Sequence, residues 1–309
     1  MGIRITNLLP AAWMITAAFC FATMGALAHT AGARCDWLLV AFLRIACTFV
    51  FSVELARAAG ARLVVWRPRT LWMRSVAGTI SLVCSFYALT HLPIADALTL
   101  TNTYPLWIVL VSSRRRGGGE IGADLACVVC AVLGVVLIQA PYLSGTGDHR
   151  AVFVALLASF ATAVAMMGLH RLREVDARAV VAHFSGLASL VLAGLLVFVK
   201  PSAISATFDR TAVFLLLGVG VCGTVGQVLL TKAFASGPPA RVAVLSLTQV
   251  VFGLGYDLIL QTRQLTFTTL LGFVMVLAPT AWITLQAARR SEPDRLTRED
   301  GLRERSLAS

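Results

Sequence analysis

The sequence predicts an all-α integral membrane protein with ten transmembrane helices, built as two inverted five-helix repeats with both termini in the cytoplasm. Three observations lead to this prediction. Of the 309 residues, 58% are hydrophobic and only 13% are charged, whereas about a quarter of the residues of a soluble protein are charged. Ten stretches with few or no charges are each long enough to cross a bilayer. One region of the first half recurs in altered form 145 positions later.

The bounds of the predicted helices follow from the charged residues, because a spanning helix needs about 20 predominantly apolar residues and charges end it. The predicted helices are 9–29, 37–56, 71–91, 95–113 and 121–140 in the first half, and 151–170, 179–199, 211–232, 241–260 and 266–287 in the second. The first stretch follows Arg4 and imitates a secretory signal. Because many further membrane segments follow it, we expect it to be retained as the first helix.

The internal repeat relates residues 75–110 to residues 220–255. Nine of these 36 aligned positions are identical, namely Val76/Val221, Gly78/Gly223, Thr79/Thr224, Val83/Val228, Ala88/Ala233, Pro93/Pro238, Ala95/Ala240, Leu100/Leu245 and Thr103/Thr248. Each copy reads as an apolar segment, a short turn marked by proline and a second apolar segment, which is typical of a membrane helical hairpin. We therefore expect a first repeat at 1–145, a second repeat at 146–290 and a charged, disordered cytoplasmic tail at 291–309.

Lys and Arg are distributed unequally between the two sides of the predicted membrane domain. Twenty of them fall in the N-terminus, in the loops after the second, fourth, sixth and eighth helices, and in the tail, if Arg74, Lys232 and Arg241 at the adjoining helix ends are counted with these loops. The other side holds only Arg34, Arg150, Lys200, Arg210 and Arg263. Positively charged loops tend to stay in the cytoplasm. Both termini are therefore predicted to be cytoplasmic, in a multi-pass protein of the plasma (inner) membrane.

An odd number of helices in each repeat has a consequence for function. The second half must enter the membrane with the opposite orientation to the first, so the two halves are predicted to be inverted. Two similar halves related by an axis in the membrane plane can exchange conformations and expose one central site to either side in turn. This arrangement predicts a transporter whose site lies where the halves meet.

Composition also excludes several kinds of partner. The formal charge of +11 comes from residues scattered through short loops and not from one basic face, so nucleic-acid binding is not expected. The seven cysteines are an odd number and lie almost all in apolar segments, so no disulfide framework is predicted. Cys127 and Cys130 have the spacing of a metal or redox pair, but no second pair or His is near them. We expect structural cysteines, with no metal site and no cofactor.

Polar side chains share faces on the fourth and ninth predicted helices, which are related by the repeat. The candidate substrate-binding or pathway residues on these faces are Thr99, Asn102 and Thr103 on the fourth helix and Ser246, Gln249 and Tyr256 on the ninth. Gln227 on the eighth helix and Tyr104, which is expected to share a central cavity with Arg44, join them. Hydroxyl groups also mediate helix packing in membranes, which is the alternative for Ser and Thr. The amides of Asn102 and Gln249 are costly in lipid, so they are expected to face protein or water.

Arg44 is the most informative single residue of the predicted membrane domain. It lies eight positions after Asp36, or about 12 Å along a helix, and an intramembrane Arg costs at least about 2.5 kcal/mol unless a partner or a cavity relieves it. It is either part of a structural contact or a cavity residue that holds an anionic group. Its counterpart in the second repeat is expected near His183. Both residues join the candidate site, and no catalytic residue is predicted.

Short motifs in both halves resemble a known family. In the first half they are Phe86-Tyr87-Ala88-Leu89, the run 92–97 and Tyr104-Pro105-Leu106, and in the second they are Lys232-Ala233-Phe234 and the run 239–243. With the helix count and the repeat period, the chain resembles the EamA type of the drug/metabolite transporter superfamily over nearly its whole length. The resemblance implies transport of a small organic metabolite and an Arg in the second helix. Pro105 has Val250 as its counterpart, so the fourth and ninth helices need not bend alike.

We therefore expect a secondary transporter and not an enzyme, with a small-molecule substrate (an amino acid, a cofactor or a related compound) and the lipid bilayer as partners. A polytopic membrane enzyme is one alternative, but the sequence contains no nucleophile turn, no H-E-x-x-H and no acidic cluster for a diphosphate-bound metal. A membrane receptor or scaffold is the other, against which the inversion argues. The sequence leaves open the substrate, the direction of transport, the coupling ion and the oligomeric state.

Overall fold

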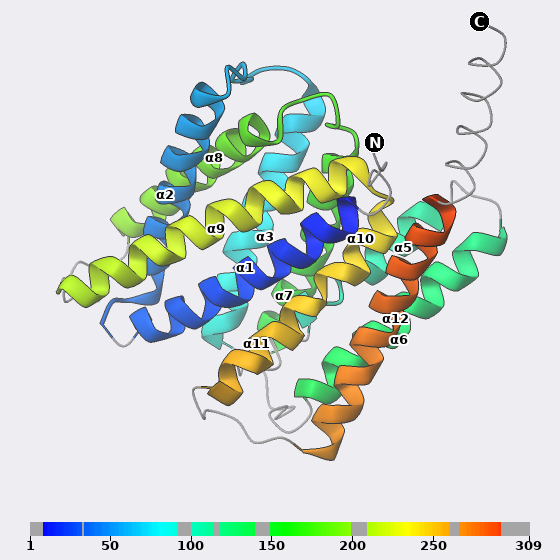
Figure 1. The fold of residues 1–309 in the computed structure, drawn as a ribbon. Helices are drawn as coiled ribbons and strands as arrows, with labels where there is room; N and C mark the ends of the chain where they lie inside the picture. Colours follow the sequence, from blue (N-terminus) through cyan, green and yellow to red (C-terminus); the bar gives the residue numbers. More distant parts are fainter. Residues whose placement is uncertain are drawn as a thin grey trace, which may run out of the picture.

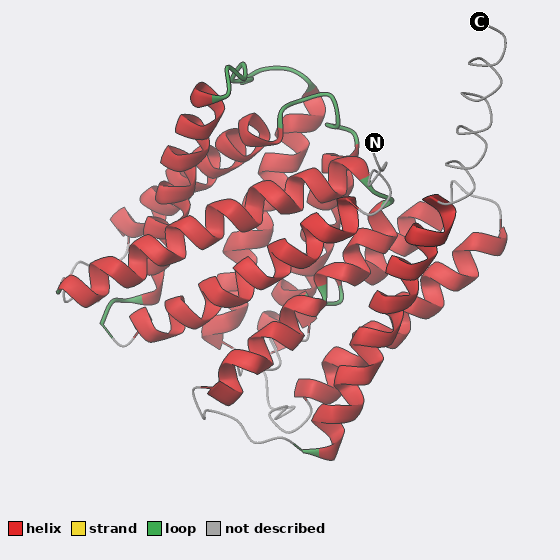
Figure 2. Cartoon of the chain, viewed as in Figure 1, coloured by secondary structure: helices red, strands yellow, loops and turns green. Residues whose placement is uncertain are grey.

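The computed structural model describes residues 9–32, 34–91, 100–113, 118–139, 149–198, 209–259 and 266–291. These residues form helices joined by turns and short loops, and no strand occurs among them (Figure 1, Figure 2). The helices are α1 (Leu9–Gly32), α2 (Trp37–Ala58), α3 (Arg69–His91), α5 (Tyr104–Ser113), α6 (Gly118–Gln139), α7 (His149–His170), α8 (Ala177–Phe198), α9 (Arg210–Ser236), α10 (Pro239–Ser246), α11 (Thr248–Ile259) and α12 (Phe267–Ser291). The predicted all-α class is confirmed for these residues.

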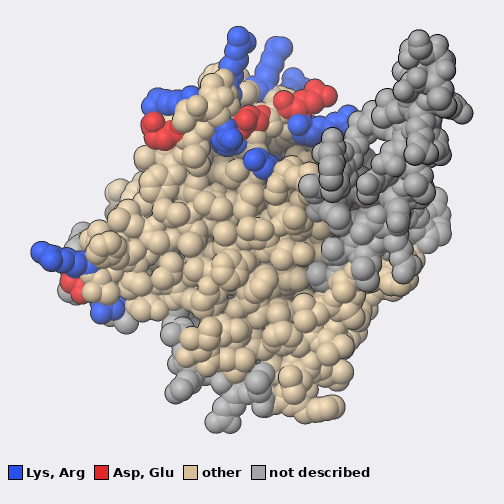
Figure 3. Space-filling model, viewed as in Figure 1, with Lys and Arg blue, Asp and Glu red and all other residues tan. Residues whose placement is uncertain are grey.

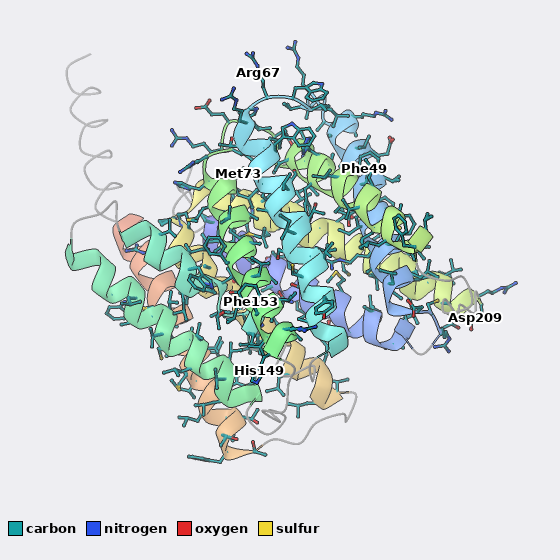
Figure 4. All side chains as sticks on the ribbon, turned by 180° about the vertical axis from the view of Figure 1, so that it is seen from behind. Phe49, Arg67, Met73, His149, Phe153 and Asp209 are labelled. Atoms are coloured by element: carbon teal, nitrogen blue, oxygen red, sulfur yellow. The ribbon has the colours of Figure 1, made fainter. Side chains whose placement is uncertain are left out.

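The surface of the molecule fits a bilayer. Among the described helices, α1, α2, α7, α8 and α9 are long and apolar enough to cross a membrane. Figure 3 shows charged side chains gathered at one end of the molecule and in a small group at another corner, with a broad uncharged surface between them on the visible face. Arg67 lies at the first end, and Asp209 and His149 lie at the opposite end (Figure 4).

Short polar signals fix the ends of the long helices. The Asp36 carboxylate accepts a hydrogen bond from the Leu38 N–H at 2.8 Å and so caps the start of α2. Gly60 has a positive φ of 64° just after the end of α2, and the N–H groups of Gly60 and Ala61 donate to the carbonyls of Arg57 and Ala56. This pattern satisfies the last carbonyls of the helix and needs the conformational freedom of glycine.

Two predicted helices differ from the structure, whereas the other eight agree within about four residues at each end. The prediction of one uninterrupted helix at 241–260 is wrong, because the chain breaks at Leu247 between α10 and α11. The helix predicted at 95–113 is also interrupted, because Asn102 and Thr103 form a turn before α5. Residues 95–99 of that predicted helix lie outside the described residues.

Small residues let the helices approach closely. The main helix pairs are α1 with α9, α3 with α7, α2 with α8, and α6 with α12 (Figure 1). A methyl group added to Gly226 of α9 would lie 3.0 Å from the Phe21 ring of α1. Gly223 and Gly226 therefore permit close helix approach, and α7 likewise buries a series of alanines.

The α6–α12 interface provides a test of this packing. We expect Gly134→Ala to lower the melting temperature, because the new methyl group would lie 2.7 Å from the Gly272 carbonyl oxygen and 2.9 Å from Met275 Cβ. Overpacking of this kind costs about 1–3 kcal/mol. Gly122→Ala in the same helix is the matched control, since nothing lies within 4 Å of its new methyl group. Equal melting temperatures for the two variants would contradict the packing at Gly134.

Candidate functional site

The breaks in the two interrupted helices occur at repeat-related positions. Thr103 Oγ1 donates to the Leu100 carbonyl at 2.6 Å, and Thr248 Oγ1 donates to the Leu245 carbonyl at 2.7 Å. Both residue pairs are identities of the 145-residue repeat. A hydroxyl that occupies a carbonyl three residues back competes with the regular helical hydrogen bonds. The sequence pattern Leu-x-x-Thr therefore produces the same interruption twice, although Pro105 is present in one copy only.

The two breaks are joined directly across the molecule. The Tyr104 hydroxyl at the start of α5 hydrogen-bonds to the Ser246 hydroxyl at the end of α10. Thr103 also bonds to Ser159 Oγ of α7 at 2.9 Å. Three of the predicted site residues, Tyr104, Ser246 and Thr103, are thus brought together with Ser159, which the sequence analysis missed.

Arg44 lies on α2 against α9, which belongs to the other half of the chain. A methyl group added to Gly223 would lie 3.5 Å from Arg44 Nε. The Nε atom is buried and has no hydrogen-bond partner. The ion pairs Arg34–Asp209 and Arg57–Glu54 do not include Arg44, and no acidic partner contacts Arg44 within the described part of the chain.

His183 is not brought to Arg44 by any described contact. Its Nδ1 lies 2.7 Å from Ser75 Oγ of α3, and its ring and the Trp72 ring pack nearly perpendicular to each other, with 4.8 Å between their centroids. His183 therefore connects α8 to the first turns of α3. At the 145-residue offset the position that corresponds to Arg44 is Ser189, whose hydroxyl is also buried without a partner.

The remaining predicted site residues are dispersed. The Tyr256 hydroxyl of α11 bonds to Thr23 Oγ1 of α1 at 2.7 Å. Gln227 is buried in α9 with 9% of its surface exposed, whereas Gln249 is exposed and Asn102 is half-buried. Thr99 lies outside the described residues.

Arg74 was counted among the cytoplasmic loop arginines, but the structure buries it in α3. Only 1% of its surface is exposed. The sequence carried a signal for this, because Arg74 falls inside the predicted helix 71–91. The positive-inside rule treats every Arg near a helix end alike. It therefore does not indicate whether the Arg74 side chain points to solvent or into the protein.

The end of the molecule opposite Arg67 holds an ion pair between the two halves. Arg34 Nε, in the turn between α1 and α2, lies 3.5 Å from Asp209 Oδ2. Asp209 also caps α9 by accepting a hydrogen bond from the Ala212 N–H at 2.7 Å. Both side chains are partly exposed, so the pair can separate at little cost.

These groups can form hydrogen bonds with a polar solute. In the described part of the chain, no group of three or more His, Cys, Asp or Glu side chains could hold a metal ion. The hydroxyls, amides and guanidinium offer hydrogen-bond donors and positive charge, which suits recognition of a polar or anionic small molecule.

We expect the double variant Cys127→Ala/Cys130→Ala to keep its melting temperature and any solute flux within a few fold of wild type. The thiol of Cys130 donates only a long contact of 3.5 Å to the Met275 carbonyl, and a thiol is a weak donor. Melting curves and metal analysis of the purified protein check this. A stoichiometric metal that the double variant loses would overturn the structural assignment of these cysteines.

Comparison with known proteins places these features in context. Residues 149–285 match the model of the EamA-like transporter family. The chain is 31% identical over 268 residues to a Pseudomonas aeruginosa protein named pseudopaline exporter CntI. The alignment covers 85% of this chain and 91% of the relative. It is also 27% identical over 222 residues to an uncharacterized transporter of Helicobacter pylori. That alignment covers 71% of this chain and 74% of the other protein.

A solved structure, described only as the crystal structure of a protein, has the same fold. Its TM-score with this chain is 0.77 at 19% sequence identity, and the match covers 91% of this chain and 98% of the other. At this identity the likeness concerns the fold alone.

Proposed function

The chain belongs to the EamA-like transporter family, and from this premise we propose that it is a secondary transporter that moves a small organic metabolite across the plasma membrane by alternating access. It is a multi-pass membrane protein whose relatives bear the names of transporters. The proposed site lies between two inverted five-helix repeats, 1–145 and 146–290. Both termini are cytoplasmic in this proposal.

The observation that carries the proposal is the pair of matched helix breaks joined by Tyr104 and Ser246. Interrupted helices at corresponding positions of two repeats are typical of the substrate site of transporters, because the freed backbone and side-chain groups face one central place. The threonines that produce both breaks occupy repeat-related positions.

Helix packing and chain direction also support two inverted repeats. Suppose that α1 corresponds to α7 and that α3 corresponds to α9. Exchanging the two halves then turns the helix pair α1–α9 into the pair α7–α3. Both of these helix pairs make extensive contacts. The pairs α2–α8 and α6–α12 each exchange into themselves. α1 starts in the upper part of the molecule, on the side of the α2–α3 connection, whereas α7 starts at His149 in the lower part (Figure 1, Figure 4).

Reconstitution into liposomes tests the proposal. Purified protein is expected to carry a small metabolite down its gradient, and a proton gradient is applied in parallel to detect coupling. Because one relative is named an exporter, we propose to begin with solute movement in the export direction. Liposomes that hold well-folded protein but show no flux of any solute in a broad metabolite panel would contradict the proposal.

The contact between the two breaks gives a sharper prediction. We expect Tyr104→Phe and Ser246→Ala each to lower flux several-fold, because each removes the bond between the two breaks. Ser246→Ala also leaves the Tyr104 hydroxyl unpaired at a cost of about 1–3 kcal/mol, whereas in Tyr104→Phe the Ser246 hydroxyl still donates to the Ala243 carbonyl at 2.6 Å. The double variant should be no worse than either single variant, since both remove the same bond. Thr30→Ala is the control, because the exposed Thr30 hydroxyl bonds only to the Ala26 carbonyl of its own helix. Additive losses in the double variant would show that the two hydroxyls act independently.

A further inference from the structure

Arg74 of α3 holds a buried positive charge for which the described part of the chain provides no counter-ion. Its side chain is 1% exposed, and its Nε and Nη1 atoms have no hydrogen-bond partner. The guanidinium carbon lies 4.4 Å from the centre of the Phe184 ring of α8. A ring face attracts a cation but does not replace the hydrogen bonds that the guanidinium gives up on leaving water.

Gly78 makes the space that this guanidinium occupies, and Gly168 lets α7 approach the base of the Arg74 side chain. A methyl group added to Gly78, one turn further along α3, would overlap Arg74 Nη1 and the Phe184 ring. A methyl group added to Gly168 of α7 would lie 3.4 Å from Arg74 Cβ. The side chain is therefore enclosed by α3, α7 and α8 and is not extended towards solvent.

The acidic residues of the nearby connection do not neutralise it. Glu174 and Asp176, between α7 and α8, are both exposed. Asp176 accepts a hydrogen bond from the Arg178 N–H at 2.8 Å instead. Ser75 follows Arg74 in sequence, and His183 precedes Phe184. These two neighbours hydrogen-bond to each other, with Ser75 Oγ 2.7 Å from His183 Nδ1.

We propose that Arg74 is a second anion-binding group of the protein, on the side opposite the Arg34–Asp209 pair, and that the transported metabolite carries a carboxylate or phosphate. This inference rests on the proposed transport function. Arg44 and Arg74 then hold the anion at two depths, and Phe184 covers Arg74 in this conformation. Movement of α8 away from α3 exposes the planar guanidinium, whose paired donors match two oxygens of a carboxylate or phosphate.

The anion could come from a soluble metabolite or from a phospholipid headgroup, which share the same oxygen chemistry. We assign it to a soluble anion, because Arg74 is enclosed between helices and does not belong to the exposed arginines of the α2–α3 loop. The test therefore has one arm for each source.

The experiment measures the melting temperature of the full-length protein in detergent micelles with succinate, inorganic phosphate or chloride at equal ionic strength. A ligand that binds the folded state raises the melting temperature. We expect succinate or phosphate, but not chloride, to stabilise the wild type. In chloride, Arg74→Met is expected to melt about 2 °C or more above wild type, because an unpaired buried charge is removed. It should need at least tenfold more anion for the same further shift.

Two further variants keep the result interpretable. Arg74→Lys retains the charge but lacks the planar fork, so its response to the anions should be weaker while its fold is kept. Arg69→Ala, which removes an exposed Arg at the start of α3, should respond as wild type. An Arg74→Met variant that melts below wild type, or variants at Arg74 that respond like wild type, would overturn the proposal. Stabilisation by added anionic phospholipid alone would overturn the assignment to a soluble anion.

Flux measurements separate this proposal from the transport function. An anion response that depends on Arg74, in a protein that moves no solute, supports the site and contradicts transport. Flux of an uncharged solute that Arg74→Met leaves unchanged supports transport and overturns the site.

Discussion

Arg44→Ala is expected to reduce solute flux by about 30-fold or more, while the protein still folds and inserts into the membrane. The reason is that removal of one partner of a buried charged contact costs roughly 2 kcal/mol or more. The guanidinium lies against Gly223 of the opposite half, and its buried Nε has no partner among the described residues. A charge held at that cost within the membrane is explained by a solute or a gating carboxylate that binds it. Liposome flux, with the amount of inserted protein measured in parallel, checks the prediction.

Two controls accompany this variant. Arg44→Lys keeps the charge but loses the fork of donors, so flux should fall less than in Arg44→Ala if the contact is to a carboxylate or phosphate. Arg57→Ala on the same helix removes an exposed ion pair, with Glu54 at 3.0 Å, and exposed pairs contribute little. Wild-type flux in a well-expressed Arg44→Ala variant would exclude Arg44 from the transport pathway.

Joining Arg34→Cys to Asp209→Cys with a thiol crosslinker is expected to bring flux down to that of protein-free liposomes, and cleavage of the linker should restore it. The native side chains are 3.5 Å apart and belong to different halves of the chain. In the proposed alternating access, this end must open once in each cycle. The weak exposed ion pair allows that opening, whereas a covalent link does not.

The crosslinking experiment requires a background in which the seven native cysteines are replaced. The matched control joins Glu54→Cys to Arg57→Cys, because these residues lie within one helix and their native side chains also form an ion pair. A link inside one helix should leave flux unchanged. Undiminished flux in fully crosslinked Arg34→Cys/Asp209→Cys protein would show that this end does not open during transport.

The positions of most helices could be predicted from the sequence alone. In lipid every backbone group must be hydrogen-bonded within the protein, so an apolar stretch of about 20 residues is driven into a helix whatever its neighbours are. The windows at 37–56 and 179–199 therefore reappear as α2 and α8. Glycine positions such as Gly226 were also predictable, because a missing side chain limits what can pack there.

The helix breaks were only partly visible in the sequence. Thr103 and Thr248 were recognised as repeat-related and polar, but a threonine in an apolar helix often bonds to its own backbone without interrupting it, as Thr231 does within α9. What distinguishes the two breaks is the contact that each makes across the molecule, Thr103 with Ser159 and Ser246 with Tyr104.

The sequence by itself determined that this chain is helical, is apolar enough for a membrane and carries one region twice at an offset of 145 positions, because these properties depend on local hydropathy and spacing. Only the tertiary structure decided that Arg74 is enclosed beneath Phe184, that His183 binds Ser75 and not the surroundings of Arg44, and that Arg34 meets Asp209. The physical reason is that a helix of apolar residues shows little difference between its faces in lipid. Which side chain meets which is therefore set by shape, through glycines such as Gly78 and Gly223 that admit a neighbour from a distant part of the chain.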